Sequence, residues 1–86
     1  MNVLFYSNVL EYTKGEKSYT ACNSASVREL IIELGEHYGD RLKEFLLGDS
    51  NCIFLVNSTG LMKTGGLDTK LKQGDKIEIL PFADAG

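Results

Sequence analysis

The sequence predicts an α+β fold in which a mixed sheet of about five strands carries one main helix on one face. Two observations indicate this class. Short runs that are apolar, or that alternate between apolar and polar residues as β-strands do, lie near both ends of the chain. One well-formed helical repeat lies between them, and strands interrupted by such a helix are typical of two-layer α+β domains.

The 86-residue length leaves room for one small domain, which we expect to span residues 1–86 with a flexible tail from about residue 82. A net charge of −3 argues against nucleic-acid binding, because phosphate contacts need a concentrated basic face. No apolar run approaches the ~20 residues of a membrane span, and the first residues lack the pattern of a secretory signal. We therefore expect a cytoplasmic protein that binds neither nucleic acid nor a membrane.

The first 22 residues predict a β-hairpin. Residues 2–6 form an uncharged, β-rich run, and residues 17–22 alternate between polar and partly apolar side chains. Between them, Lys14-Gly15-Glu16 is a turn signal. We expect two strands joined by a long and irregular connection.

A helix is predicted from Val27 to Tyr38. Ser26 and Glu29 have the spacing of a capping box, in which each side chain hydrogen-bonds a free backbone N–H at the helix start. The helical repeat places five apolar side chains on one face, namely Val27, Leu30, Ile31, Leu34 and Tyr38. Gly39 suits the left-handed position that often ends a helix.

The second half of the chain predicts shorter elements. Residues 40–47 favour a short second helix that Gly48 ends, and the strongly apolar residues 52–56 favour a buried strand. Residues 57–60 suggest a tight turn and residues 61–63 a short returning strand. Residues 67–71 favour a brief helical turn whose two leucines enter the core.

The last strand is predicted from Lys76, with Ile77 and Ile79 on one face and polar residues between them. Pro81 should end it, because proline cannot donate to a ladder of hydrogen bonds. The predicted order is strand, strand, helix, short helix, strand, short strand, strand. This order matches the β-grasp fold, in which the first and last strands are parallel neighbours at the centre of the sheet.

The side chains that most often carry chemistry are few and scattered. Cys22 and Cys52 lack metal-ligand spacing, and His37 offers no cluster, so we expect no metal site and two free thiols that are buried or partly buried. His37 is expected to be a solvated residue near the helix end. The sequence lacks a nucleophile–base pair and a phosphate loop, which makes an autonomous enzyme the least favoured function.

Several stretches then point to a family. They are Val3-Leu4-Phe5-Tyr6, Ser26-Val27-Arg28-Glu29-Leu30, Phe54-Leu55-Val56-Asn57, and Leu71-Lys72-Gln73-Gly74-Asp75 leading into Ile77-Glu78-Ile79-Leu80-Pro81 and a short tail that ends in Gly86. In this order and spacing the chain resembles the ubiquitin-like sulfur carriers. Within them it is most similar to the small subunit of molybdopterin synthase, with the sulfur carrier of thiamine biosynthesis as a shorter relative.

The resemblance implies a function for the tail. The Gly86 carboxylate would be adenylated by a ubiquitin-activating-type adenylyltransferase that uses ATP, and then converted to a thiocarboxylate. The large subunit of molybdopterin synthase would take the sulfur in molybdenum cofactor biosynthesis. The protein itself would bind no cofactor and would act as a non-catalytic subunit or co-substrate.

The tail departs from the family at one position. The usual ending is Gly-Gly, whereas the penultimate residue here is Ala85. Two alternatives therefore stay open. The chain could be a ubiquitin-like modifier that is joined to other proteins through Gly86, or a β-grasp interaction module whose tail is inert.

A partner-binding surface is expected beside the tail. If Val3, Phe5, Ile77 and Ile79 face the core, alternation along the strands turns their neighbours to the other face of the sheet. The residues expected there, or at the end of the last strand, are Leu4, Tyr6, Leu80, Pro81 and Phe82. An exposed apolar patch of this kind usually marks a partner site. The alternatives are that a loop covers these residues, or that the register differs by one.

Overall fold

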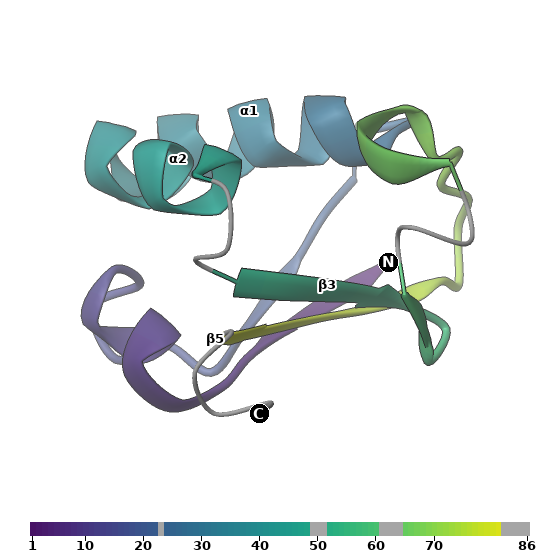
Figure 1. The fold of residues 1–86 in the computed structure, drawn as a ribbon. Coiled ribbons are helices and arrows are strands. Elements are labelled where there is room, and N and C mark those ends of the chain that lie inside the picture. Colours follow the sequence, from purple (N-terminus) through teal and green to yellow (C-terminus); the bar gives the residue numbers. More distant parts are fainter. Residues whose placement is uncertain (23, 49–51, 61–64, 82–86) are drawn as a thin grey trace.

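The computed structural model describes residues 1–22, 24–48, 52–60 and 65–81. These residues form a two-layer α+β domain in which α1 (Val27–Tyr38) and α2 (Asp40–Leu47) lie over the same face of a sheet (Figure 1). The sheet has five strands in the order β2-β1-β5-β3-β4. The predicted α+β class and β-grasp architecture are confirmed.

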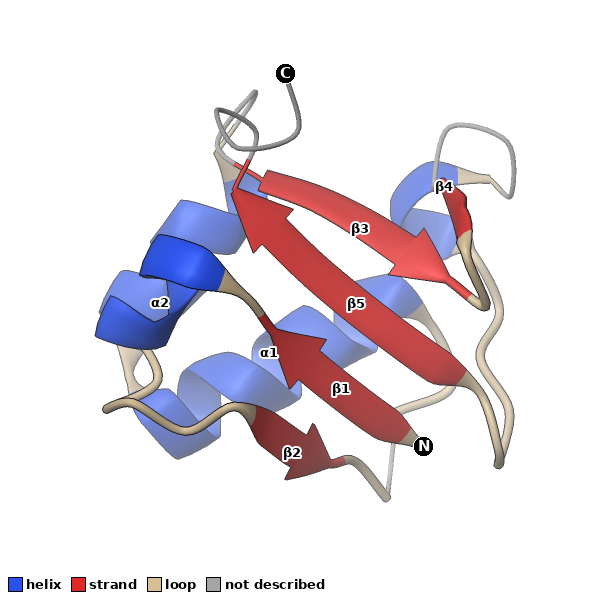
Figure 2. Cartoon of the chain, turned by 90° about the horizontal axis from the view of Figure 1, so that it is seen from below, coloured by secondary structure: helices blue, strands red, loops and turns tan. Residues whose placement is uncertain are grey.

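The two strands that lie farthest apart in the sequence are neighbours at the centre of the sheet. β1 (Asn2–Phe5) runs parallel to β5 (Lys76–Pro81), whereas all other strand pairs are antiparallel. Figure 2 shows β5 between β1 and β3 (Cys52–Val56). β2 (Ser18–Thr20) and β4 (Thr59–Gly60) form the two edges. β5 is therefore hydrogen-bonded on both sides.

The core lies between the sheet and the two helices. Val3, Phe5, Ile77 and Ile79 are buried on the helix side of the two central strands, as their alternation predicts. Against these side chains the two helices pack their own buried apolar residues, which are Val27, Leu30, Ile31, Leu34, Leu42 and Leu46. Each fully buried aliphatic side chain of this size stabilises the fold by about 1.5–3 kcal/mol.

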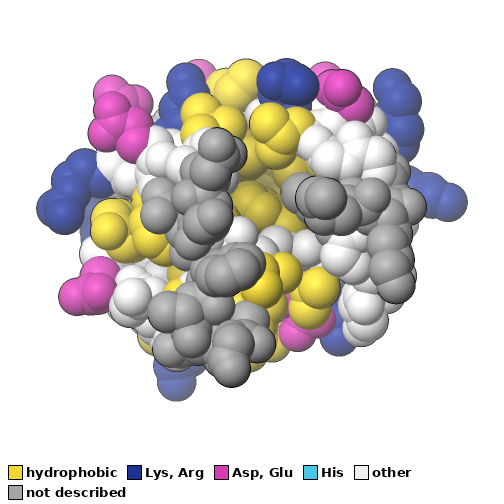
Figure 3. Space-filling model, in the orientation of Figure 1, with side chains coloured by type: hydrophobic (Ala, Val, Ile, Leu, Met, Phe, Trp, Pro, Cys, Tyr) yellow, Lys and Arg dark blue, Asp and Glu magenta, His cyan; other side chains and the backbone are white. Residues whose placement is uncertain are grey.

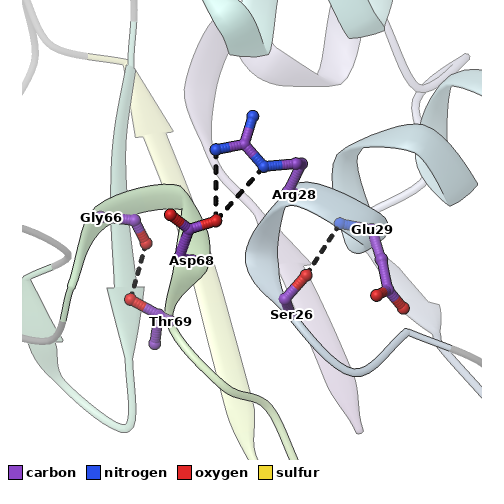
Figure 4. Close-up of polar contacts among 6 residues, drawn as sticks. All are labelled: Ser26, Arg28, Glu29, Gly66, Asp68 and Thr69. Atoms are coloured by element: carbon purple, nitrogen blue, oxygen red, sulfur yellow. Dashed lines mark hydrogen bonds and ion pairs between the residues drawn. The ribbon is translucent and has the colours of Figure 1, made fainter.

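The start of α1 joins the helix to the segment before β5 (Figure 4). The backbone N–H of Glu29 donates to Ser26 Oγ at 3.2 Å, which confirms the predicted cap. The Glu29 carboxylate accepts from the N–H of Ala25, one residue earlier than a standard capping box requires. Arg28 pairs with Asp68 of η2 (Gly66–Asp68) at 3.2 Å, in an exposed ion pair that adds little stability.

Three local predictions differ from the structure. The turn predicted over residues 57–60 has only two residues, Asn57 and Ser58, because Thr59–Gly60 already forms β4; the strand expected at residues 61–63 lies outside the described residues. The connection after β1 contains a 3-10 helix, η1 (Ser7–Glu11), that buries Val9. Gly39 has φ +114° and ψ 165°, so it joins α1 to α2 in an extended conformation open to glycine rather than in the left-handed helical one.

Two negative findings concern the described part of the chain. None of its helices combines the length and the apolar character that crossing a bilayer requires. Within the same residues, no three His, Cys, Asp or Glu side chains come together in a way that could hold a metal ion.

Candidate functional site

The candidate site is the face of the sheet that α1 and α2 leave uncovered, together with the end of β5 (Figure 2). We call this surface the open face, and define it by six residues: Leu4 and Tyr6 from β1 and the residue after it, Ile53 and Leu55 from β3, and Glu78 and Leu80 from β5. Because side chains alternate along a strand, these residues point away from the buried neighbours that fill the core. These six residues are mainly apolar, and the polar residues on the same side of the sheet lie toward its other end, as Asn2, Thr20 and Lys76 do, or on the edge strand beside Leu4, as Ser18 does.

The strand register arranges these side chains in rows. Leu4 and Leu55 are the Cα partners of Glu78 on its two sides, and Leu80 lies opposite Ile53. Side chains of such partners on one face lie about 5 Å apart at Cβ. The Glu78 carboxylate therefore stands in the middle of an apolar surface.

Tyr6 connects β1 to β5 across this face. Its backbone N–H donates to the carbonyl of Ile79 at 3.2 Å, and its hydroxyl donates to Glu78 Oε2 at 2.9 Å. The hydrogen bond to Glu78 raises the pKa of the Tyr6 hydroxyl, because loss of the proton would place two negative charges side by side. The Tyr6 side chain is 38% exposed, so its ring remains available for contact.

A hollow of about 350 Å³ lies at the end of β1, beside Tyr6. It is lined by Leu4, Phe5, Tyr6, Ser7, Leu10 and Lys17. Figure 3 views the molecule from the side of its two layers rather than onto the open face, and there hydrophobic side chains gather toward the middle while most acidic and basic side chains lie around the outline. The hollow combines apolar walls with one amine, which suits a protein side chain better than a highly charged ligand.

The structure places four of the seven predicted site residues. Leu4 and Leu80 are half-buried on the open face, and Tyr6 is exposed. Pro81 is buried and is the Cα partner of Cys52 at the end of β5. Phe82, Ala85 and Gly86 lie outside the described residues.

Three members of the open face were not predicted as site residues. Ile53 and Leu55 belong to an uninterrupted apolar run, so alternation could not show which of its side chains face outward. Glu78 was recognised only as a polar residue that alternates with Ile77 and Ile79. Glu78 lies beside Leu4 because β1 and β5 pair in parallel, and only the register of this pair identifies it as a residue of the open face.

The thiols in the described residues give no sign of nucleophilic chemistry. Burial raises the pKa of the Cys52 thiol to about 11, so it is protonated at neutral pH. Its Sγ donates to the carbonyl of Leu46 at 3.9 Å. Cys22 is a free cysteine like Cys52, but it is exposed, contrary to the prediction that both would be buried or partly buried.

Comparisons with solved structures find the same fold in proteins of similar length. CysO from Mycobacterium tuberculosis superposes with a TM-score of 0.82 and 26% identity, covering 93% of this chain and 96% of that one. The BexX/CysO complex from Amycolatopsis orientalis matches with a TM-score of 0.79 and 26% identity, covering 93% of this chain and 92% of that one. The small archaeal modifier protein 1 (SAMP1) from Methanosarcina acetivorans gives a TM-score of 0.78 and 26% identity, covering 99% and 94%.

A comparison with curated proteins finds no significant match. The comparison with protein families does find one, because residues 3–84 match the ThiS family. This match includes both helices and, except for Asn2 at the start of β1, all five strands of the sheet. The chain belongs to the ThiS family of ubiquitin-like sulfur carriers.

Proposed function

We propose that the protein carries sulfur as a thiocarboxylate on Gly86 and donates it as the non-catalytic small subunit of molybdopterin synthase, in molybdenum cofactor biosynthesis. A ubiquitin-activating-type adenylyltransferase transfers AMP from ATP to the Gly86 carboxylate and releases pyrophosphate, because a carboxylate is by itself a poor electrophile. A sulfur donor then displaces AMP from the acyl carbon. The large subunit of the synthase receives the sulfur, and the carrier binds no cofactor of its own.

The observation that carries this proposal is the family match over residues 3–84. The position of β5 supports it, since the strand that leads toward Gly86 is held between two neighbours and ends at Pro81. A firmly anchored strand followed by a short tail that ends in Ala83-Asp84-Ala85-Gly86 suits a tail that must enter a narrow active site. The penultimate Ala85 adds one methyl group to that tail.

The proposal assigns partner binding to Leu4, Tyr6, Leu80 and Phe82, whereas Pro81, which was also expected to bind the partner, is buried and marks the end of β5. Support comes from the contiguous apolar surface that the first three form with Ile53 and Leu55 beside the end of β5. Exposed apolar surface of this kind usually marks a protein contact. The CysO protein of Amycolatopsis orientalis, which has this fold, occurs in a complex with BexX.

Mass spectrometry tests the function directly. The purified chain is incubated with an adenylyltransferase of this type, ATP and a sulfur donor. We expect a mass gain equal to the replacement of one oxygen by sulfur, located on the C-terminal peptide. A chain that lacks Gly86 is the control and should show no gain, and Ala85→Gly should react at least as fast as the wild type. An unchanged wild-type mass, with an enzyme that modifies another carrier, would contradict the proposal.

A second function, a protein modifier, is favoured by the similarity to SAMP1, which is named as a modifier protein. In this case Gly86 would be joined to lysine amines of other proteins. Tagged protein expressed in its own host would then yield larger species that contain a Gly86–lysine isopeptide. Free thiocarboxylate without such adducts would favour the sulfur carrier, and full function after deletion of Gly86 would favour an interaction module with an inert tail.

A further inference from the structure

Glu78 is the one acidic residue of the open face, and it occupies the middle of that face. Its side chain is only 18% exposed, with Leu4 and Leu55 beside it as Cα partners and Leu80 two residues along the same strand. Partial burial removes part of the carboxylate's own hydration, and the charged group interrupts the apolar contact surface around it. Its presence therefore needs a reason other than solubility.

The chain balances this charge only in part. Tyr6 donates one hydrogen bond to Oε2, but a hydroxyl is neutral. Lys76 Nζ lies 3.8 Å from Oε1, near the limit of an ion pair, and its side chain is 49% exposed. Pairs of this kind are weak, because water screens them and the lysine loses side-chain entropy.

Docking of an apolar partner would change the surroundings of Glu78. The partner would remove the water that now solvates the carboxylate, and a charge buried without a close counter-charge is strongly unfavourable. A purely apolar partner surface would thus be rejected at this point. A partner surface with one cationic side chain opposite Glu78 would bind more tightly, because that side chain would form an ion pair with the carboxylate while the surrounding apolar residues make contact.

We propose that Glu78 is a specificity determinant of the open face and selects a partner that places an Arg or Lys side chain against it. Tyr6 is a positioning residue, since its hydroxyl holds Oε2. Oε1 lies 3.8 Å from the exposed amine of Lys76 and can exchange this weak ion pair for one with the incoming cation. This inference rests on the proposed function, in which the partner is the adenylyltransferase. An arginine suits the site best, because its planar group can bind a carboxylate through two hydrogen bonds.

The experiment measures the affinity of the adenylyltransferase for the unmodified chain by calorimetry, at several salt concentrations. Glu78→Gln keeps the shape of the side chain and removes its charge, and we expect it to weaken binding by roughly tenfold or more. Glu78→Lys should weaken binding further, whereas Tyr6→Phe should have a smaller effect. Glu36→Gln is the matched control, because Glu36 is exposed on α1, which lies on the other side of the sheet. This variant should bind the adenylyltransferase with the same affinity as the wild type.

Equal affinities of the wild type and Glu78→Gln, with both chains folded by circular dichroism, would overturn the inference. A charge-reversed partner, in which the contacting Arg or Lys is replaced by Glu, should regain affinity for Glu78→Lys. Binding that depends on Glu78 without sulfur transfer would support the inference and contradict the proposed function. Absence of any wild-type binding would contradict both.

Discussion

Gly35 shows how a single residue sets the distance between the two helices. It is buried on α1, and a Cβ atom at this position would lie 2.9 Å from Cβ of Lys43 on α2. Glycine inside a helix costs about 1 kcal/mol relative to alanine. The close approach of α2 explains why glycine stands here, since any larger residue would push the helices apart.

We expect Gly35→Ala to destabilise the protein. The forced contact should cost about 1–3 kcal/mol, which exceeds the gain of about 1 kcal/mol in helix propensity. The net loss of about 1 kcal/mol can be measured by urea unfolding. Glu36→Ala, at an exposed neighbouring position, should change the free energy of unfolding by less than about 0.5 kcal/mol. An increase in stability for Gly35→Ala would show that α2 can move without cost.

Residue patterns predicted which side chains point inward but not which ones meet. Alternation placed Val3 and Phe5 in the core and Leu4 outside, and the structure confirms this. The position of Glu78 between Leu4 and Leu55 depends on the registers of three strands that are far apart in the sequence. No local pattern contains that information, so the charge at the middle of the open face could not be predicted.

At the scale of elements, the β3–β4 hairpin shows how turn chemistry can mislead a sequence-based prediction. Asn57 and Ser58 both have positive φ, at 50° and 71°, as the two central residues of a type I′ turn require. The prediction instead extended the turn over residues 57–60, of which Thr59 and Gly60 belong to β4. Asn57 is suited to its position because its side chain binds Asp75 at 3.0 Å and the N–H of Lys76 at 2.9 Å, which also fixes the turn against β5.

Substitutions in this turn should have opposite effects. Ser58→Gly should stabilise the protein by about 0.5–1 kcal/mol, because glycine adopts positive φ without strain. Asn57→Gly should destabilise it, since the loss of two side-chain hydrogen bonds at about 1 kcal/mol each outweighs any relief of strain. Thermal unfolding of the two variants measures both effects. Equal shifts of the same sign would show that backbone strain alone governs the turn.

The helices were the elements best predicted from the sequence. Their apolar repeat and flanking residues gave the bounds of α1 and α2 as the structure has them. η1 was missed, because its helical turn is held by contacts of the buried Val9 and by backbone bonds such as Tyr12 N–H to Val9 C=O at 2.9 Å rather than by a repeat. Segments of this length contain too few residues to show a period.

At the scale of the whole molecule, acid stability should depend on Asp75, which lies just before β5. Its carboxylate accepts hydrogen bonds from Asn57 Nδ2 at 3.0 Å and from the N–H of Lys72 at 2.9 Å. The hydrogen bond from Asn57, followed by that from Lys72, holds the pKa of Asp75 below its usual value. A lowered pKa in the folded state means that the folded protein binds the proton less readily than the unfolded chain does.

The stabilisation from Asp75 should therefore be present above pH ~4, the ordinary pKa of an aspartate, and should be lost as the pH falls through the lowered folded value. Asp75→Asn should lower the free energy of unfolding at neutral pH and flatten its decline in acid. Urea unfolding of the wild type and of Asp75→Asn at several pH values between neutral and acidic measures how steeply the free energy of unfolding of each protein falls with pH. If the free energy of unfolding fell equally steeply with pH for both proteins, carboxylates other than Asp75 would be responsible for the loss of stability in acid.

The overall topology was predicted because the order of elements restricts it. A hairpin, a long helical connection and a last strand leave few ways to bury every apolar stripe, and a crossover through α1 favours parallel pairing of the first and last strands. The pairing of residues 2–5 with residues 76–79 confirms this. Its register could not be predicted, because it depends on how the core packs.

The central position of β5 also determines how the domain responds to mechanical force. In the proposed function, a partner that draws the residues after Pro81 into its active site would pull β5 along its own axis. The hydrogen bonds to β1 and β3 run across the strand, so this force shears two ladders at the same time. An edge strand under tension could peel away one bond after another. We therefore expect that the tail can be pulled hard while the sheet, and the open face on it, keeps its shape.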